Sequence, residues 1–560
     1  MYTVSNVTKT VKKSLCKSHK HQQCILHKLF DGFYTLITKK GDMESEKRSL
    51  MKNTVKVSLL YLISRIFGLF RDVLQAWFLG IGAQSDAFLI AFRIPNLFRQ
   101  IFAEGALSSA LVPYLTRMKH EGRADDVKGL LSLVMLIVGC VVLMLCVAIM
   151  LFPDRVIHMF APGFSPEQNE YATKYILIMF PFIFLVFICA VLTAGLHSVN
   201  HFFTPALAPV LFNITLITFV VSAIKFKLPV EWICLGVLVS GFSKLFPRVI
   251  AFWHKGLSLG AVTLQSWKDL KAVSQRFFPC LAGVGIHQIN VLLDTVVASF
   301  LPCGQVTMLH YAYRFMHAPL AVLGIATSIT FLPYFSKIAI KKHGHLKFAL
   351  VEVSKLLFFV ATPITLFLCF HSKLLFKVLF SHKADVNQIY MAGNMLTILA
   401  LSIFILSINR VIIKLFYALQ DTKTPTWIIS ITTAMKIAGN IFSVAVYGGV
   451  YGIVLSTVIF DAVATPAYLS ALATKHDIKF DFSYFRQFLW KYFLQLLSIA
   501  TGFLFAYIFV FNILTRLLLR GTKIFYITHL LMAVGLLAIS MLALLLTRKK
   551  YGLDLYFIEK

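Results

Sequence analysis

Long, uninterrupted apolar runs dominate this chain, and they restrict its fold more than any other feature. About twenty consecutive apolar residues are enough for a helix to cross the hydrocarbon core of a bilayer, and we count about fourteen such runs. With 58% hydrophobic and 14% charged residues, the composition lies outside that of a soluble domain. The runs are continuous and do not alternate in polarity, which argues against a β-barrel. The sequence therefore predicts an all-α polytopic membrane protein.

Loop charge orients the predicted spans. Lysines and arginines gather in the loops that follow even-numbered spans, so the positive-inside rule places both termini in the cytoplasm and requires an even number of spans. Orientation also explains most of the net charge of +30, and no nucleic-acid partner is expected. Spans ten and twelve are the most open to a break. The spans fall near residues 54–80, 84–114, 127–152, 171–197, 203–225, 229–253, 272–300, 306–336, 348–370, 387–418, 424–447, 449–473, 486–513 and 524–547.

An internal repeat predicts two lobes. The motif ALSSALVPYLTR at 106–117 returns as ATSITFLPYFSK at 326–337, and the same offset of 220 residues joins Thr204-Pro205 to Thr424-Pro425. Six spans in each half make parallel repeats, an arrangement typical of transporters with a substrate site between the lobes. A duplicated scaffold without transport is the alternative. The predicted domains are an N-lobe at 51–253, a C-lobe at 254–473, and two further helices with a basic tail at 474–560.

Residues 1–50 differ from the rest, being basic and only briefly apolar. They contain no hydrophobic region followed by a cleavage site, so a secretory signal peptide is not expected. Two interpretations stay open: a disordered cytoplasmic arm, or an upstream stretch before a true start at Met43 or Met51. The second is favoured because Met51 immediately precedes the first span.

Charge inside the apolar spans is the most informative local feature. At membrane depth a charged side chain is costly unless it faces protein or water, so these groups are expected to line a hydrated cavity. Because span eight occupies the place in the second half that span two occupies in the first, we expect Arg314 to face Arg99. The charged residues in and near the first two spans are Arg65, Arg71, Asp72, Asp86, Arg93, Arg99 and Glu104, and span eight adds Arg314.

Arginine indicates the sign of the ligand. It keeps its charge in any environment, and its planar fork binds phosphate or carboxylate oxygens in pairs. Five arginines against three carboxylates leave positive charge over, which predicts an anionic, phosphorylated ligand. The alternative is that the arginines pair internally or extend to the interface. Arg65 and Asp72, seven residues apart, share a helix face and are expected to pair.

Several motifs carry a resemblance to a known family. The segments SRIFGLFRD, SDAFLIAFRIPNLFRQIFAEGALSSALVP, ALAPVLFNI, YRFMHAPLAVLGIATSITFLP and ALQDTKTP resemble those of the MurJ (MviN) lipid II flippases, in the multidrug/oligosaccharidyl-lipid/polysaccharide exporter superfamily. The resemblance covers the chain from residue 54 onward. It implies fourteen helices in the bacterial inner membrane and transfer of undecaprenyl-diphosphate-linked disaccharide pentapeptide to the outer leaflet. Cell-wall synthesis or division proteins are candidate partners.

The resemblance also implies roles for residues. The family's required cavity arginines fall on Arg65, Arg71, Arg99 and Arg314, its required aspartate falls on Asp86, and Arg93, Glu104 and His317 are accessory candidates. Family members often carry acidic residues next to the span-eight arginine, where this chain has Tyr313 and His317. His317 titrates near neutral pH when unperturbed, but a packing or hydrogen-bonding role is favoured.

A second departure concerns sodium. Some family members hold a sodium ion between helices seven and eleven, and the matching positions here are Asp294, Lys436 and Asn440. A lysine at a ligand position suggests an ammonium that pairs with Asp294 and replaces the metal. No cofactor, metal or disulfide framework is expected, because the nine cysteines are dispersed without a CxxC motif.

The remaining function classes are weighed against these features. No P-loop, dinucleotide-binding glycine pattern, zinc-protease motif or nucleophile elbow is present, so an enzyme is not expected. A drug exporter of the same superfamily would need an acidic cavity, and this one is basic. A flippase for another polyprenyl-diphosphate glycan and a scaffold for cell-wall enzymes stay open as alternatives.

Overall fold

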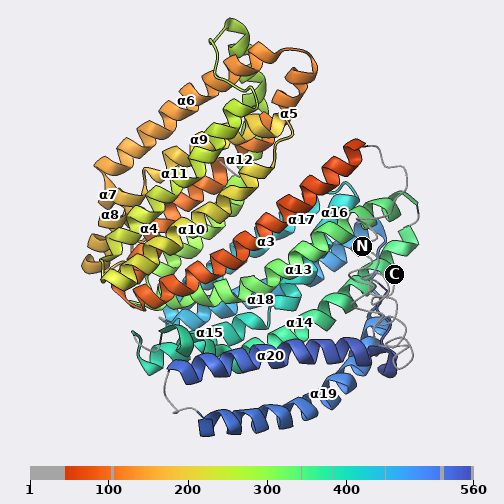
Figure 1. Ribbon diagram of the computed structural model, residues 1–560. Helices are drawn as coiled ribbons and strands as arrows, with labels where there is room; N and C mark the ends of the chain where they lie inside the picture. Colours follow the sequence, from red (N-terminus) through yellow and green to blue (C-terminus); the bar gives the residue numbers. More distant parts are fainter. Residues whose placement is uncertain are drawn as a thin grey trace, which may run out of the picture. The chain divides into compact units, whose positions relative to one another are not determined.

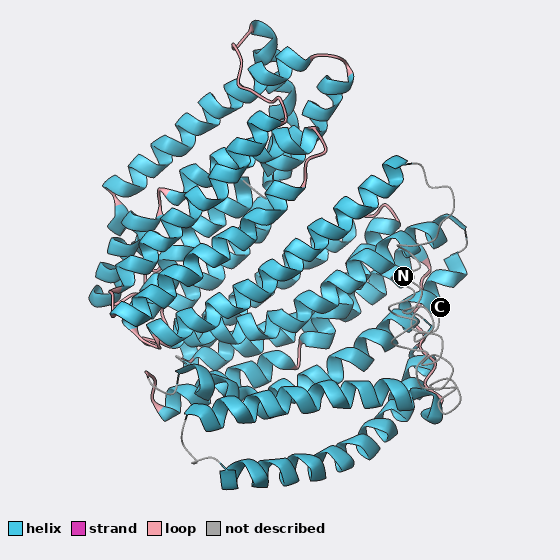
Figure 2. Cartoon of the chain, viewed as in Figure 1, coloured by secondary structure: helices cyan, strands magenta, loops and turns pink. Residues whose placement is uncertain are grey.

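The computed structural model describes residues 45–102, 106–341, 343–380, 383–447, 449–517 and 523–556. Glu104 lies outside these ranges, so its predicted accessory role stays a prediction. Within the described ranges every regular element is a helix and no strand occurs (Figure 2). The all-α fold predicted from the sequence is therefore confirmed.

Figure 1 labels the helices along the chain. The first part of the chain contains α3 (Ser45–Leu79), α4 (Ala83–Phe102), α5 (Ala106–His120), α6 (Ala124–Leu151), α7 (Pro153–Phe160), α8 (Pro166–Met179), α9 (Phe182–Ser198), α10 (Phe203–Phe226) and α11 (Val230–His254). The second part contains α12 (Leu264–Ser299), α13 (Gln305–Lys341), α14 (His343–Phe380), α15 (Val386–Ala400), α16 (Ile403–Ala418), α17 (Lys423–Tyr447), α18 (Val450–His476), α19 (Phe482–Leu517), α20 (Lys523–Thr547) and the 3₁₀ helix η1 (Arg548–Tyr551).

Each predicted span coincides with one helix or with two consecutive helices. Span four is divided into α8 and α9 at Pro181, which has no backbone N–H to continue the helix. The expected break in span ten is confirmed by α15 and α16, whereas span twelve is the continuous helix α18. Among the described residues, nine helices or helix pairs are long and apolar enough to cross a bilayer, and the total of fourteen stays a prediction.

The chain divides into two compact units, Met1–Leu62 and Ile63–Lys560. In the first unit the structure describes only the beginning of α3. The second unit holds two large apolar cores, one built mainly by α4–α11 and the other mainly by α13–α18. A third, small core joins α14 to α19 and α20 through Phe359, Tyr492 and Leu544. Helix α12 contributes to both large cores, because Val273 packs in the first and Val297 in the second.

Local backbone chemistry fixes the beginning and end of the helices that carry the site. Helix α3 ends before Gly80, whose φ of +73° is a left-handed conformation that glycine adopts without strain. A Cβ at Gly80 would lie 2.8 Å from the Cβ of Lys383, so only glycine allows this close approach. The short connection at 80–82 leads into α4, and the first turn of α4 contains Asp86.

Candidate functional site

The centre of the site is a carboxylate that two arginines share. Asp72 on α3 is 6% exposed, and its Oδ1 accepts hydrogen bonds from Arg71 Nε at 3.0 Å and Nη2 at 2.5 Å. Its Oδ2 accepts from Nε of Arg314 on α13. Both carboxylate oxygens are therefore engaged, and the contact joins α3 to α13. The expected pairing of Arg65 with Asp72 is wrong, because Arg71 and Arg314 occupy the carboxylate.

Arg71 also joins α3 to α10. Its Nη1 donates to Asn213 Oδ1 at 3.0 Å, and its guanidinium lies 5.6 Å from the centroid of the Phe212 ring. The Asn213 amide in turn donates to the backbone oxygen of Ser64 at 2.8 Å. These contacts hold the Arg71 fork in one orientation, so little side-chain entropy is left to lose when an anion binds.

A cavity of about 560 Å³ opens beside this cluster. Its size is within the range of pockets that hold small-molecule ligands, about 300–1,000 Å³. Arg314 lines it together with two other cationic side chains, Arg93 and Lys436, and the lining carboxylates are Asp294 and Asp461. The lining therefore has three cationic and two anionic side chains. Its walls come from α4, α12, α13, α16, α17 and α18.

Arg93 crosses from α4 to α12. Its Nη1 donates to the hydroxyl of Thr295 at 2.5 Å, beside the cavity carboxylate Asp294. Thr295 is 1% exposed, so this contact anchors the arginine on a fixed point of α12. Arg93, an accessory candidate by sequence, therefore lies in the cavity with Arg314.

A lysine ammonium forms an ion pair between α12 and α17. The Lys436 ammonium donates to Asp294 Oδ2 at 2.6 Å, and the Asn440 amide nitrogen donates to Oδ1 at 3.0 Å. The pairing of Lys436 with Asp294 that the sequence predicted is confirmed. Both Asp294 oxygens are thus bound by protein donors, and the Lys436 ammonium neutralises the carboxylate.

Tyr313 and His317 face the cavity from α13. Their rings stack with centroids 6.2 Å apart, and the Tyr313 hydroxyl hydrogen-bonds the Thr457 hydroxyl at 2.7 Å. His310, one turn earlier, also lines the cavity. The ring contact between Tyr313 and His317 agrees with the favoured packing role of His317.

Three of the predicted arginines, Arg65, Arg71 and Arg99, lie outside the cavity lining. Arg65 is exposed, and its Nη1 donates to the backbone oxygen of Ala321 at 3.2 Å. Arg99 donates from Nε to Asn96 Oδ1 at 2.8 Å, three residues earlier on α4. That Arg99 faces Arg314 stays a prediction. The ion-pair partner of Arg314 is Asp72 on α3.

Asp86 has a different place from the one predicted. It is fully buried, and its carboxylate accepts from Gln168 Nε2 at 3.0 Å, Gly304 N at 2.6 Å, Thr307 N at 2.8 Å and Thr307 Oγ1 at 2.5 Å. The donors at Gly304 and Thr307 belong to the start of α13, where backbone N–H groups have no partner within the helix. In this arrangement Asp86 is inaccessible to a ligand and connects α4, α8 and α13. A carboxylate at a helix N-terminus is favoured by the helix dipole.

Sequence reasoning missed several residues of the cavity. Asp461 on α18 and His310 on α13 line it, and Arg410 on α16 lies nearby with its Nη1 3.5 Å from the backbone oxygen of Leu320. Asp461 and Arg410 sit inside apolar spans, in IFDAVAT and SINRVII. The rule that selected the arginines of the first two spans, charge at membrane depth, would have selected them as well.

Comparison with known proteins agrees with this architecture. Residues 75–529 match the sequence profile of the family described as "Lipid II flippase MurJ". A relative from Rhizobium tropici, "Probable lipid II flippase MurJ", is 31% identical over 404 residues, which are 70% of this chain and 75% of the relative. The "Lipid II flippase MurJ" of Burkholderia cenocepacia is 29% identical over 404 residues, 70% of this chain and 78% of that protein.

Solved structures give the same result. The structure titled "Lipid II flippase MurJ, inward closed conformation" is 25% identical, with a TM-score of 0.70 over 88% of this chain and 99% of that one. An inward-facing multidrug resistance MATE family transporter of the MOP superfamily is 15% identical, with a TM-score of 0.62 over 76% of this chain and 95% of that one. The second likeness concerns the fold alone. The first, together with the profile match over most of the length and the arginine-lined cavity, shows that this multi-pass membrane protein belongs to the MurJ lipid II flippase family.

Proposed function

We propose that this chain moves lipid II, the undecaprenyl-diphosphate-linked peptidoglycan precursor, from the cytoplasmic to the periplasmic leaflet by alternating access. The observation that carries the proposal is the 560 Å³ cavity with its surplus of cationic groups, in a chain of this family. A diphosphate is an anion with several oxygens, and guanidinium groups bind such oxygens in pairs. The polyprenyl tail needs no polar site and stays in the hydrocarbon.

In this proposal the arginines have different roles in binding the head group. Arg71 and Arg314 hold the diphosphate in exchange for Asp72, and Arg93 adds charge deeper in the cavity. Arg65 and Arg99 are the outer cations, which attract the head group before it enters. No bond is made or broken in such a transfer, so the protein acts as a transporter without a chemical step. The two lobes, the N-lobe at 51–253 and the C-lobe at 254–473, move against each other, and both termini stay in the cytoplasm.

We also propose that Lys436 makes sodium unnecessary at the α12–α17 contact. The Asp294 carboxylate already has an ammonium 2.6 Å away and an amide at 3.0 Å. A sodium ion there would have to displace or face the ammonium, which like-charge repulsion opposes. Transport in vesicles should be equal in sodium and in potassium buffers. Sodium-dependent transport that disappears in Asn440→Ala would contradict this proposal.

The main experiment depletes the protein in its host and measures lipid II in each leaflet. Lipid II should accumulate on the cytoplasmic side. Rescue should fail with Arg71→Ala and with Arg314→Ala, and should succeed with Arg155→Ala, an exposed arginine of α7 that serves as the matched control. If both variants restore full flipping, these two arginines do not bind the substrate. If lipid II stays normal while another polyprenyl-linked glycan accumulates, the substrate is that glycan.

A further inference from the structure

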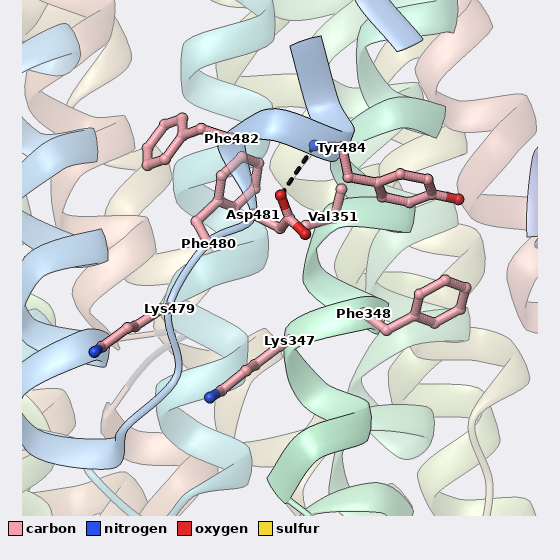
Figure 3. A pocket seen from close by; sticks show the side chains of 8 residues that line it. All are labelled: Lys347, Phe348, Val351, Lys479, Phe480, Asp481, Phe482 and Tyr484. Carbon is pink, nitrogen blue, oxygen red and sulfur yellow. Dashed lines mark hydrogen bonds between the residues drawn. The ribbon is translucent and has the colours of Figure 1, made fainter. Parts of the chain in front are cut away.

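A second pocket, of about 540 Å³, shares no lining residue with the arginine cavity. Its lining comes from the first turns of α14, the connection between α18 and α19, and the first turn of α19 (Figure 3). The lining residues are Lys347, Phe348, Val351, Lys479, Phe480, Asp481, Phe482 and Tyr484. It therefore combines two lysines, one carboxylate and four aromatic rings.

The pocket lies beside the ends of two candidate membrane spans. One candidate membrane span begins at His345, two residues before Lys347, and another ends at His476, three residues before Lys479. Three of the four aromatic residues are exposed, Phe482 by 65%, Phe348 by 43% and Tyr484 by 38%, whereas Phe480 is half-buried. Exposed aromatic rings next to lysines are typical of the level of lipid head groups, where one end of the side chain is apolar and the other is wet.

The ammonium groups of the two pocket lysines are weakly paired or exposed. Lys347 Nζ lies 4.0 Å from Asp477 Oδ2, at the limit of an ion pair, and the Asp477 side chain is 85% exposed. Such an exposed pair contributes little. Lys479 is exposed and has no hydrogen-bond or ion-pair partner within the described part of the chain. In Figure 3 both lysine side chains lie below the rings of Phe480 and Phe482.

The other wall of the pocket is fixed in place. The Lys355 ammonium lies 3.3 Å from the centroid of the Tyr484 ring and donates to Glu352 Oε1 at 2.7 Å. Both members of this ion pair are almost fully buried, so the charge of Lys355 is used inside the protein. It holds the Tyr484 ring as a rigid apolar surface through a cation–π contact.

Asp481 makes the pocket selective. Its Oδ1 accepts from the backbone N–H of Tyr484 at 2.9 Å, which caps α19, as the dashed line in Figure 3 shows. The carboxylate repels a bare phosphate, but it accepts hydrogen bonds from hydroxyl groups. A ligand that suits the whole pocket therefore has a phosphate for the lysines, hydroxyl groups for Asp481, and an apolar part for the rings.

We propose that this pocket binds the head group of an anionic phospholipid of the phosphatidylglycerol type. The phosphate lies between Lys347 and Lys479, the glycerol hydroxyls donate to Asp481, and the beginning of the acyl chains contacts the aromatic rings. Basic pockets between membrane helices are a recurring form of anionic-lipid site. The bound lipid joins the first turns of α14 and α19, independently of the arginine cavity.

The test uses the purified full-length protein in nanodiscs of phosphatidylcholine that contain a small fraction of photoactivatable phosphatidylglycerol. Labelled peptides are identified and quantified by mass spectrometry. Labelling should concentrate in residues 347–351 and 479–484, and unlabelled phosphatidylglycerol should compete for it. In Lys347→Gln/Lys479→Gln, labelling of these peptides should fall about 25-fold, at about fivefold for each lysine near the membrane surface.

The matched control is Lys119→Gln/Lys268→Gln, which removes two exposed lysines elsewhere and should leave the labelling unchanged. Thermal unfolding without the probe should be equal in all variants, so that a loss of labelling reports the pocket and not the fold. The proposal is overturned if the lysine variant labels like the wild type. It is equally overturned if inorganic phosphate or phosphatidylethanolamine competes as well as phosphatidylglycerol, because the site would then not select this head group.

Discussion

Replacing Asp86 should release the beginning of α13 from α4. The backbone N–H groups of Gly304 and Thr307 both donate to this carboxylate, at 2.6 and 2.8 Å. A hydrogen bond to a charged acceptor contributes about 1.5–3 kcal/mol, so the two amides account for about 3–6 kcal/mol before the carboxylate's desolvation is subtracted. Because desolvation offsets part of this, we expect Asp86→Ala to lower the local opening free energy by about 2–3 kcal/mol.

Hydrogen–deuterium exchange measures this quantity directly. At tenfold per about 1.4 kcal/mol, the amides of Gly304 and Thr307 should exchange about 30- to 150-fold faster in Asp86→Ala than in the wild type. Asp86→Asn keeps one acceptor oxygen and should show a smaller increase. The control is Asp154→Asn, which removes the charge of an exposed carboxylate that accepts from the Thr173 hydroxyl. Equal exchange at both amides in the wild type and in Asp86→Ala would refute the clamp.

Three further predictions concern single positions of the second unit. Gly304→Ala should destabilise the protein by about 1–3 kcal/mol in thermal or detergent unfolding. The φ of Gly304 is +87°, and the new Cβ would lie 2.7 Å from the side chain of Ile81. Gly502→Ala, which has open space around it, should leave the stability unchanged. Asp72→Asn should bind the lipid-linked diphosphate more tightly yet flip it more slowly, as measured by binding and by leaflet assays, and an unchanged affinity would contradict competition between carboxylate and ligand. Lys436→Met should unfold at a lower temperature than the wild type, because the Asp294 carboxylate loses its charged partner. The double variant Lys436→Met/Asp294→Leu should recover part of this stability, because it leaves no unpaired charge.

The sequence predicted the fold largely because membrane depth leaves few options. Continuous apolar runs of about twenty residues have to be helices, since backbone groups in lipid must be satisfied within the segment. The broken spans were harder to predict. Pro181 divides α8 from α9, whereas Pro466 sits inside the continuous helix α18. Whether a proline ends a helix depends on neighbouring helices, which one sequence does not reveal.

The sequence predicted the residue types of the site better than it predicted which residues pair with each other. The pair of Lys436 and Asp294 followed from the resemblance, which matched both residues to one cation site, and the contact is present in the structure. The partner of Asp72 did not. Helix periodicity favoured Arg65, but the neighbouring Arg71 reaches the same carboxylate, and Arg314 approaches from a helix far away in sequence. Asp86 was assigned by resemblance, and its burial under the beginning of α13 is a tertiary feature.

In the proposed function, the Asp72 cluster keeps the protein from holding its substrate too tightly. Without ligand, the Arg71 and Arg314 forks are bound to one carboxylate, which neutralises half of their charge. A diphosphate entering the cavity offers more oxygens and more charge than Asp72, so the exchange is favourable but costs the broken ion pairs. Leaving reverses the exchange, because Asp72 takes the arginines back. A ligand shifts the inward and outward states only by its difference in affinity for them. If the distance between α3 and α13 changes as the lobes move, Arg314 loses either the carboxylate or the ligand, and the same pair of contacts then sets both binding and release.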